Sequence, residues 1–351
     1  MRVFDSTSLI AKILKIKAWK ELVDTNMHVY LLTIVYVVMV SQLFSYDMIQ
    51  EMLVLVGILS SYICFGFLWN DYCDMPMDIK AGKKRVIHEM PRAVVLGLLA
   101  LLFLTGFLLI AVFVRNIAFI LIYFFAYSVG LSYAAPLVRS KEKGWLGAAV
   151  DALGEKGFPV LLIFTYFERF TVDAVLCVSL FTMFQFKVIL DHQVFDYEAD
   201  VASGTDTLVV TMGVEKAEAI LRFLRPVFAL MYLLFVAGIY VQMPSSLVIV
   251  LLILSGYPLL KILVDKGVVT RVNVRPDIGG WIERIPLYDG YITASLGPLL
   301  FLLALQATLT YYPYAFLLAL ALASQFYILK GHFVRVASSI VRPITSRFPR
   351  K

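Results

Sequence analysis

Long apolar segments follow one another along almost the whole of this 351-residue chain. A helix needs about 20 residues to cross the roughly 30 Å hydrocarbon core of a bilayer. Ten segments reach or approach that length: 28–46, 49–69, 93–114, 117–135, 146–167, 173–195, 219–241, 245–264, 287–308 and 313–330. Only structures that satisfy their own backbone hydrogen bonds can span lipid. The pattern therefore predicts an all-α, polytopic transmembrane bundle, with nine or ten helices because the last segment is short.

Composition excludes an ordinary soluble domain. The chain is 61% hydrophobic and 16% charged, and its mean hydropathy is +0.85, whereas soluble domains are close to half apolar. The formal net charge of +6 comes from basic connections between the apolar segments, which indicates membrane topology. The lipid bilayer is an expected partner, and no nucleic acid is needed to explain the positive charge.

Basic residues gather in alternate connections, and this asymmetry sets the expected orientation. With the N-terminus inside, the outer connections hold essentially Arg115 and Arg169. The inner connections hold many more basic residues: Lys80, Lys83, Lys84, Arg85, Arg92, Arg139, Lys141, Lys143, Lys216, Lys266, Arg271, Arg275 and Arg284. We therefore expect a multi-pass integral membrane protein, located in the plasma membrane if the source is prokaryotic.

Three regions are expected along the chain. Residues 1–27 interleave Ile and Leu with Lys, which is typical of an amphipathic helix on an anionic cytoplasmic surface. An ordinary solvated segment is the alternative. Residues 28–330 form the predicted transmembrane domain, and residues 331–351 form a basic cytoplasmic tail.

Two acidic motifs follow membrane-length apolar segments, both at the predicted cytoplasmic end. The first is "NDYCDMPMD" at 70–78, and the second is "DYEAD" at 196–200. On a helix, Asp71, Asp74 and Asp78 share one face, and Asp196 and Asp200 are one turn apart. Each motif can therefore present a carboxylate cluster toward one point.

Clustered carboxylates repel one another at a membrane boundary unless they are protonated or neutralised by cations. Hard oxygen ligands with open positions suit Mg²⁺ that bridges to phosphate oxygens. Basic residues follow the first motif in "GKKR" at 82–85, and Arg139 and Lys141 lie in the next inner connection. The pattern favours a Mg²⁺–diphosphate site over solvated helix ends, which remain the alternative.

The motifs also carry a resemblance to the UbiA superfamily of intramembrane prenyltransferases. "NDYCDMPMD" resembles that family's N-D-x-x-D-x-x-x-D motif, and "DYEADVASGTDTLVVTMG" at 196–213 resembles its second motif. "YAAPLVRSK" at 133–141 is similar to the family's Tyr, Pro, Arg and Lys pattern. The resemblance covers roughly residues 25–265. It implies a helical bundle around a central cavity that holds Mg²⁺ and an isoprenyl diphosphate between the two motifs.

The resemblance implies roles for residues in these motifs. The expected Mg²⁺ ligands are the polar residues Asn70, Asp71, Asp74, Asp78, Asp196 and Asp200, among which Asp71, Asp74, Asp196 and Asp200 are the expected catalytic residues. Diphosphate contacts are expected from Tyr133, Arg139 and Lys141, and more loosely from Lys83, Lys84 and Arg85, because the loop after the first motif departs from the family pattern. For Lys187, an ion pair with Asp191 and direct diphosphate contact both remain open.

Other polar residues are candidates for the side of the cavity that receives the acceptor. Ionisable groups inside the membrane are functional candidates, so Asp151 and Glu155 are included, although mutual pairing with Lys156 is equally compatible. Asp191, His192 and Gln193 are also included, because His192 and Gln193 stand where many family members carry Lys and Asp, and Asp191 is displaced from that place by two residues. His192 fits a base or phosphate donor, or a hydrogen-bond partner of the second motif.

Three functions are compatible with these observations. The resemblance favours Mg²⁺-assisted transfer of a prenyl group from an isoprenyl diphosphate to a lipophilic acceptor, either aromatic or a polar lipid. A terpene cyclase that acts on the diphosphate without an acceptor is the alternative. A transporter is disfavoured, because the acids gather at helix ends and not at the bilayer midplane.

Overall fold

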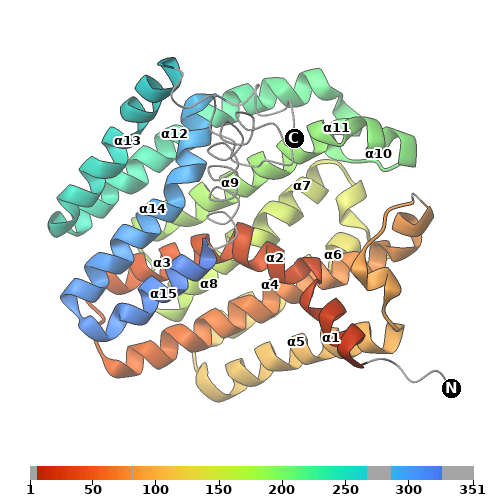
Figure 1. The fold of residues 1–351 in the computed structure, drawn as a ribbon, viewed down its shortest axis with the longest axis horizontal. Helices are drawn as coiled ribbons and strands as arrows, with labels where there is room; N and C mark the ends of the chain where they lie inside the picture. Colours follow the sequence, from red (N-terminus) through yellow and green to blue (C-terminus); the bar gives the residue numbers. More distant parts are fainter. Residues whose placement is uncertain (1–5, 81, 267–285, 326–351) are drawn as a thin grey trace, which may run out of the picture.

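The computed structural model describes residues 6–80, 82–266 and 286–325, and these residues form helices joined by short connections. Among them, eight helices are long and apolar enough to cross a membrane. The predicted all-α transmembrane bundle is confirmed (Figure 1). Residues 331–351, for which a basic tail was predicted, and the end of the tenth apolar segment lie outside the described residues.

The helices are α1 (Ser6–Leu14), α2 (Lys17–Glu21), α3 (Met27–Val40), α4 (Tyr46–Lys80), α5 (Arg92–Phe113), α6 (Ile117–Ala134), α7 (Trp145–Ala152), α8 (Phe158–Tyr166), α9 (Val172–Phe195), α10 (Tyr197–Ser203), α11 (Leu208–Met212), α12 (Val214–Gln242), α13 (Leu247–Asp265), α14 (Leu287–Thr310) and α15 (Ala315–Ser324). Short 3₁₀ turns are η2 (Val86–Glu89), η3 (Ser140–Glu142), η5 (Pro244–Ser246) and η7 (Tyr312–Tyr314). Two π-helical turns, η1 (Leu22–Asn26) and η4 (Leu153–Gly157), join α2 to α3 and α7 to α8.

Helix α3 forms the centre of the bundle. Every residue from His28 to Met39 is buried, and α4, α8, α14 and α15 pack around it. A helix that is apolar on all sides belongs in such a position, because it has no face to offer to solvent. The helices that surround α3 expose their outer apolar faces instead, which is what a lipid-facing surface requires.

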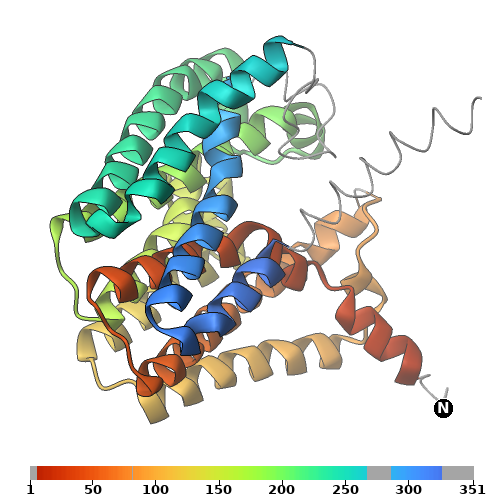
Figure 2. The same ribbon diagram turned by 60° about the vertical axis from the view of Figure 1, so that its left-hand side comes forward.

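The N-terminal region divides into two parts. Helix α1 projects from one end of the bundle, where Lys12 pairs with Glu89 at 3.2 Å (Figure 2). Residues 17–26 instead continue through η1 into α3 as one helical run, and Ala18 and Asn26 are fully buried. The helical run therefore begins before residue 28, where the sequence pattern placed the start of the transmembrane domain.

The connections divide between the two ends of the bundle. At one end, the Asn116 amide donates to the Thr165 carbonyl at 3.1 Å, and Arg169 lies 3.5 Å from the Ser41 hydroxyl. The connections after α3, before α6 and after α8 therefore meet there. Both acidic motifs lie at the opposite end, where α4 and α9 finish. The alternation expected from the basic residues is thus present in the fold.

A buried quartet of charges links α9, α12 and α14. It comprises Lys187 and Asp191 on α9, Arg225 on α12 and Asp289 on α14, each at most 8% exposed. Lys187 lies 3.1 Å from Asp289 and 3.6 Å from Asp191, and Arg225 lies 3.0 Å from Asp191. The ion pair expected between Lys187 and Asp191 is present. Two cations and two carboxylates balance, which makes their burial tolerable.

We expect Asp289→Ala to destabilise the protein by about 3–5 kcal/mol, because it leaves Lys187 and Arg225 with a single buried carboxylate. Asp265→Ala removes an exposed carboxylate at the end of α13 and should change stability by less than about 0.5 kcal/mol. Unfolding of the detergent-solubilised proteins measures both changes. Equal stability of the two variants would contradict a structural role for the quartet.

Orientation is tested by single cysteines placed in a variant that lacks the three native ones. Lys84 and Lys143 are exposed at the motif end, and Arg115 is exposed at the other. Because basic connections remain in the cytoplasm, a membrane-impermeant maleimide should label Arg115→Cys in intact cells. It should label Lys84→Cys and Lys143→Cys only after permeabilisation. Labelling of Lys84→Cys in intact cells would show that the protein has the opposite orientation.

Candidate active site

The first acidic motif occupies the last turns of α4, which continues through Pro76 to Lys80. Asp71 and Asp78 are both buried and share Arg85, from the connection that follows the helix. Arg85 lies 2.7 Å from Asp71 and 2.5 Å from Asp78, and Lys83 lies 3.8 Å from Asp78. These cations neutralise the carboxylates, so helical neighbours that would otherwise repel can be buried together.

Asp74, on the same helix, contacts the connection between α6 and α7. Lys141 forms an ion pair with it, and Arg139 lies 3.5 Å away. Lys141 also lies 3.4 Å from the Asn70 side-chain oxygen, so it joins two residues of the motif. Burial lowers the pKa of Lys141, an effect that Asp74 opposes. Arg139 adopts a positive φ of 37° as η3 begins and pairs with Glu142 at 2.6 Å.

The second motif lies where α9 ends and α10 begins. Asp196 separates the two helices, and its carbonyl accepts from the Asp200 amide at 2.8 Å. The two aspartates therefore remain one turn apart despite the break. Burial raises the pKa of Asp196, and burial together with the charge of Asp196 raises the pKa of Asp200. Lys83 opposes both shifts.

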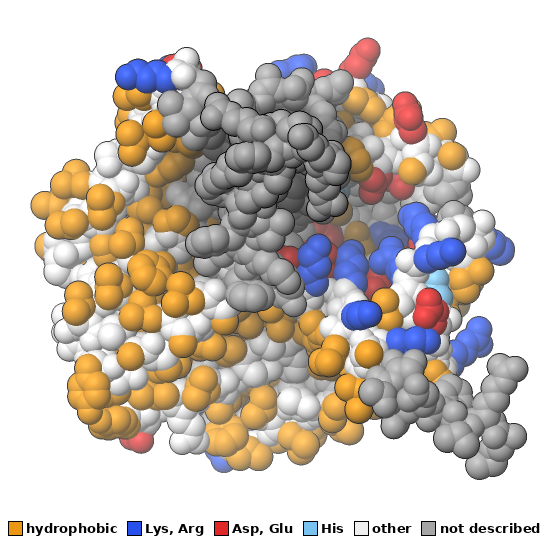
Figure 3. Space-filling model, in the orientation of Figure 1, with side chains coloured by type: hydrophobic (Ala, Val, Ile, Leu, Met, Phe, Trp, Pro, Cys, Tyr) orange, Lys and Arg blue, Asp and Glu red, His pale blue; other side chains and the backbone are white. Residues whose placement is uncertain are grey.

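The same basic residues act on both motifs. Lys83 contacts Asp78 and interacts electrostatically with Asp196 and Asp200. Lys141 contacts Asp74 and also interacts with Asp200. Acidic and basic side chains gather on one part of the surface, around the ends of α4 and α10, whereas the left-hand and lower parts of this face show many hydrophobic side chains and few charged ones (Figure 3). The two motifs therefore belong to one charged region.

The motif oxygens suit a hard divalent cation. Across residues 6–80, 82–266 and 286–325, no group of three or more His, Cys, Asp or Glu side chains is arranged to hold a metal ion alone. Mg²⁺ commonly uses only one or two carboxylates and takes its other ligands from substrate phosphates and water. Carboxylate and amide oxygens beside phosphate-type cations fit that mode of binding, so the donor set is compatible with Mg²⁺.

The remaining candidates fall into separate groups. Asp151 and Glu155 accept from the same Gln185 amide, at 2.9 Å each, inside the bundle. Gln193 accepts from the Val209 amide at 3.3 Å, and His192 is partly exposed in the last turn of α9. Lys84 is exposed. Asp191 and Lys187 lie in the buried quartet, apart from the ion pairs of the motifs.

Several residues that contact the predicted site residues were not themselves predicted from the sequence. Arg225 and Asp289 interrupt apolar segments, and an ionisable residue inside such a segment is itself a signal. Lys17 interacts electrostatically with Asp71 and Asp196, but its position in the N-terminal region gave no sign of that proximity. Asn26 and Gln185 are polar residues whose partners become visible only in three dimensions.

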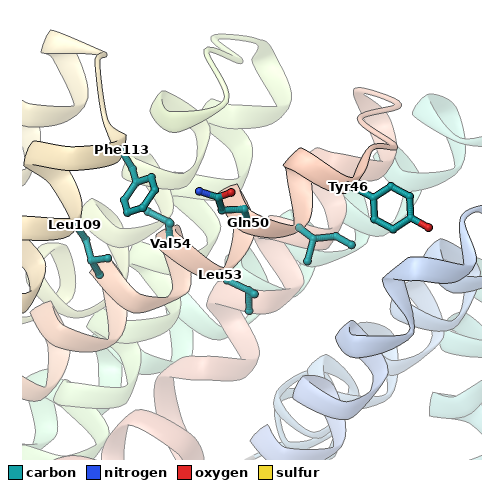
Figure 4. Close-up of a pocket in the computed structure, with 7 residues that line it drawn as sticks. Tyr46, Gln50, Leu53, Val54, Leu109 and Phe113 are labelled. Atoms are coloured by element: carbon teal, nitrogen blue, oxygen red, sulfur yellow. The ribbon is translucent and has the colours of Figure 1, made fainter.

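A shallow apolar hollow lies away from the motifs, between the first turns of α4 and the end of α5 (Figure 4). Its walls are almost entirely aliphatic or aromatic: Tyr46, Ile49, Gln50, Leu53, Val54, Leu109 and Phe113. The hollow lacks charged groups that could bind a diphosphate or a metal. The hollow therefore differs from the charged region at the other end of α4, which offers both carboxylates and cations.

Three solved structures share this fold. A UbiA homolog from Archaeoglobus fulgidus bound to DMAPP and Mg²⁺ is 17% identical, with a TM-score of 0.51 over 85% of this chain and 95% of that chain. A UbiA homolog from the same organism bound to GPP and Mg²⁺ is 16% identical, with a TM-score of 0.51 over 85% and 96%. An apo UbiA homolog from Aeropyrum pernix K1 is 12% identical, with a TM-score of 0.52 over 78% and 97%. At these identities the likeness concerns the fold alone.

Sequence comparison identifies the family independently of the structural likeness. No curated protein sequence matches this chain. The model of the UbiA prenyltransferase family matches residues 30–266, a range that contains both acidic motifs and the connection between α6 and α7. Because the match spans more than half of the chain, this protein belongs to the UbiA prenyltransferase family.

Proposed function

We propose that this protein is an intramembrane prenyltransferase that moves an isoprenyl group from its diphosphate to a lipophilic acceptor, either an aromatic compound or a polar lipid. The observation that carries the proposal is the pair of carboxylate motifs that share Lys83 and Lys141. The family match supports the reaction type. The homologous structures with DMAPP or GPP and Mg²⁺ support the donor and the metal.

The proposed Mg²⁺ ligands come from both motifs: Asn70, Asp71, Asp74, Asp78, Asp196 and Asp200. Bound Mg²⁺ would supply positive charge to the diphosphate oxygens and so stabilise the leaving group. In the reaction, the bond between the allylic carbon and the diphosphate oxygen breaks, and the diphosphate keeps the electron pair. The carbon then bonds to the acceptor, which loses a proton.

Basic side chains of this region are proposed to bind the diphosphate. Arg85 and Lys141 are held beside the motif by carboxylates, and Arg139 is held by Glu142. A diphosphate that enters the region offers phosphate oxygens, for which Arg is well suited because its donors form a planar fork. Tyr133, at the end of α6, interacts electrostatically with Asp74 and completes the proposed site on that side. The cations are thus positioned before the donor arrives.

Metal dependence tests the mechanism. We expect EDTA to abolish turnover of geranyl diphosphate, and Mg²⁺ or Mn²⁺ to restore it, because the donor charge requires a divalent counter-ion. Binding of the unreactive analogue geranyl S-thiolodiphosphate, measured by calorimetry, should likewise require the metal. Full turnover in chelator would contradict the mechanism. Release of a cyclised hydrocarbon without any acceptor would indicate a terpene cyclase.

Charge removal at the motifs gives a second test. We expect Asp74→Asn and Asp196→Asn each to lower the transfer rate by at least about 10²-fold, the scale of one preorganised electrostatic group. Glu89→Gln is the matched control, because Glu89 lies on the same side of the bundle but is 66% exposed and pairs with the partly exposed Lys12. Thermal unfolding confirms that each variant is folded. If both aspartate variants transferred the prenyl group at the wild-type rate, the motifs would be solvated helix ends without a role in the reaction.

A further inference from the structure

The two π-helical turns of the fold contact each other through a buried lysine. Lys156 in η4 donates to the Thr25 carbonyl at 2.6 Å and to the Asn26 side-chain oxygen at 2.5 Å, both in η1. Its third contact is Glu155 at 3.2 Å. Lys156 and Asn26 are fully buried. π-helical turns inside helices are frequent at functional sites. Two such turns in contact therefore make this cluster a candidate functional site.

One amide holds two carboxylates together in this cluster. The Gln185 side-chain nitrogen on α9 donates to Asp151 and to Glu155, at 2.9 Å in each case. An amide NH₂ has two donors, so each carboxylate takes one. Tyr133 on α6 forms a further hydrogen bond with Asp151. The two acids are therefore fixed as a pair by side chains from two neighbouring helices.

The charges of this cluster do not balance. The three N–H groups of the Lys156 ammonium are taken by Thr25, Asn26 and Glu155, which leaves none for Asp151. Within the described part of the chain, no basic nitrogen forms a salt bridge with Asp151. Two carboxylates thus share one ammonium in the core of a membrane protein. An unpaired buried charge is costly, so one proton bound by the pair would balance its charge, as in other close carboxyl pairs.

The two acids are less deeply buried than the ammonium and the amide that hold them. Asp151 and Tyr133 are partly exposed, and the Glu155 side chain is 14% exposed, whereas Lys156 and Gln185 are buried. Tyr133 also interacts electrostatically with Asp74 of the first motif. The pair therefore keeps some exposure and lies near the proposed diphosphate site.

We propose that Asp151 and Glu155 form a proton-sharing pair that accepts the proton which the acceptor loses when the prenyl group is transferred to it. This inference rests on the proposed function. The singly protonated pair offers one carboxylate as the base. As the allylic carbon bonds to the acceptor, the acceptor's proton moves to that carboxylate, and the diphosphate leaves with the electron pair of the broken bond. Gln185 and Tyr133 hold the pair in position.

The test uses full-length protein in nanodiscs, with labelled geranyl diphosphate as donor. Membranes from a source strain that lacks the gene supply the acceptor. We expect Asp151→Asn and Glu155→Gln to lower label transfer into lipid by at least about 10²-fold, the scale of general base catalysis. Both should bind geranyl S-thiolodiphosphate with Mg²⁺ within about threefold of wild type, because neither removes a diphosphate contact.

Infrared spectroscopy gives a readout that does not depend on turnover. The wild-type protein should show a protonated carboxyl band at neutral pH, and this band should be lost in both Asp151→Asn and Glu155→Gln. Asp173→Asn is the matched control, because Asp173 lies at the other end of α9 and pairs with Arg169 at 3.1 Å. This variant should retain the carboxyl band, and its transfer rate should stay within about threefold of the wild-type rate.

Three results would overturn this inference and leave the proposed function standing. The first is wild-type transfer in both pair variants, and the second is a carboxyl band that survives both substitutions. The third is an equal loss of analogue binding and transfer, because the pair would then serve donor binding. A wild-type protein that does not bind the analogue with Mg²⁺ would overturn the proposed function, and this inference with it.

Discussion

Neutralisation of buried carboxylates is the constraint on which the rest of this structure depends. A carboxylate at a membrane boundary or inside a bundle is costly unless a cation or a proton compensates its charge. In the first motif, Arg85 compensates Asp71 and Asp78, and Lys141 compensates Asp74. The loops after α4 and α6 are thereby drawn onto the end of α4. The ion pairs that make the burial of the motif tolerable also hold these cations where the proposed donor would lie.

The same constraint separates structural charges from those proposed to react. The quartet of Lys187, Asp191, Arg225 and Asp289 is balanced and buried, so it holds three helices together and has no charge left for a ligand. The cluster around Gln185 has two carboxylates and one ammonium, and its acids are partly exposed. The balance of charged side chains and their solvent exposure distinguish the two sets, and both have a direct electrostatic meaning.

Local patterns predicted the parts of the fold that local physics determines. Apolar length predicted the eight candidate membrane spans of the described residues, but segment 146–167, expected as one helix, is divided into α7, η4 and α8. Helical spacing predicted that Asp71, Asp74 and Asp78 share a side of α4. The π-helical turns were not predicted, and the contact that joins them, between Lys156 and Asn26, links residues more than a hundred positions apart. The pairing of Lys187 with Asp289 and of Asp191 with Arg225 was missed because these partners are also distant in the sequence. Long-range pairing of polar side chains has no periodic signature in the sequence.

The charges of the motif region also agree in polarity with the proposed reaction. Breaking the carbon–oxygen bond places negative charge on the diphosphate and positive charge on the allylic carbon. In the proposed site, cations from the loops after α4 and α6 would face the first of these charges. The pair of Asp151 and Glu155, which interacts with Tyr133, has its charge balanced by Lys156 and the proposed shared proton, so it adds no net charge of its own. Ion pairs fix the motif cations before the bond breaks, and charges that are preorganised in this way favour the charge separation that the reaction requires.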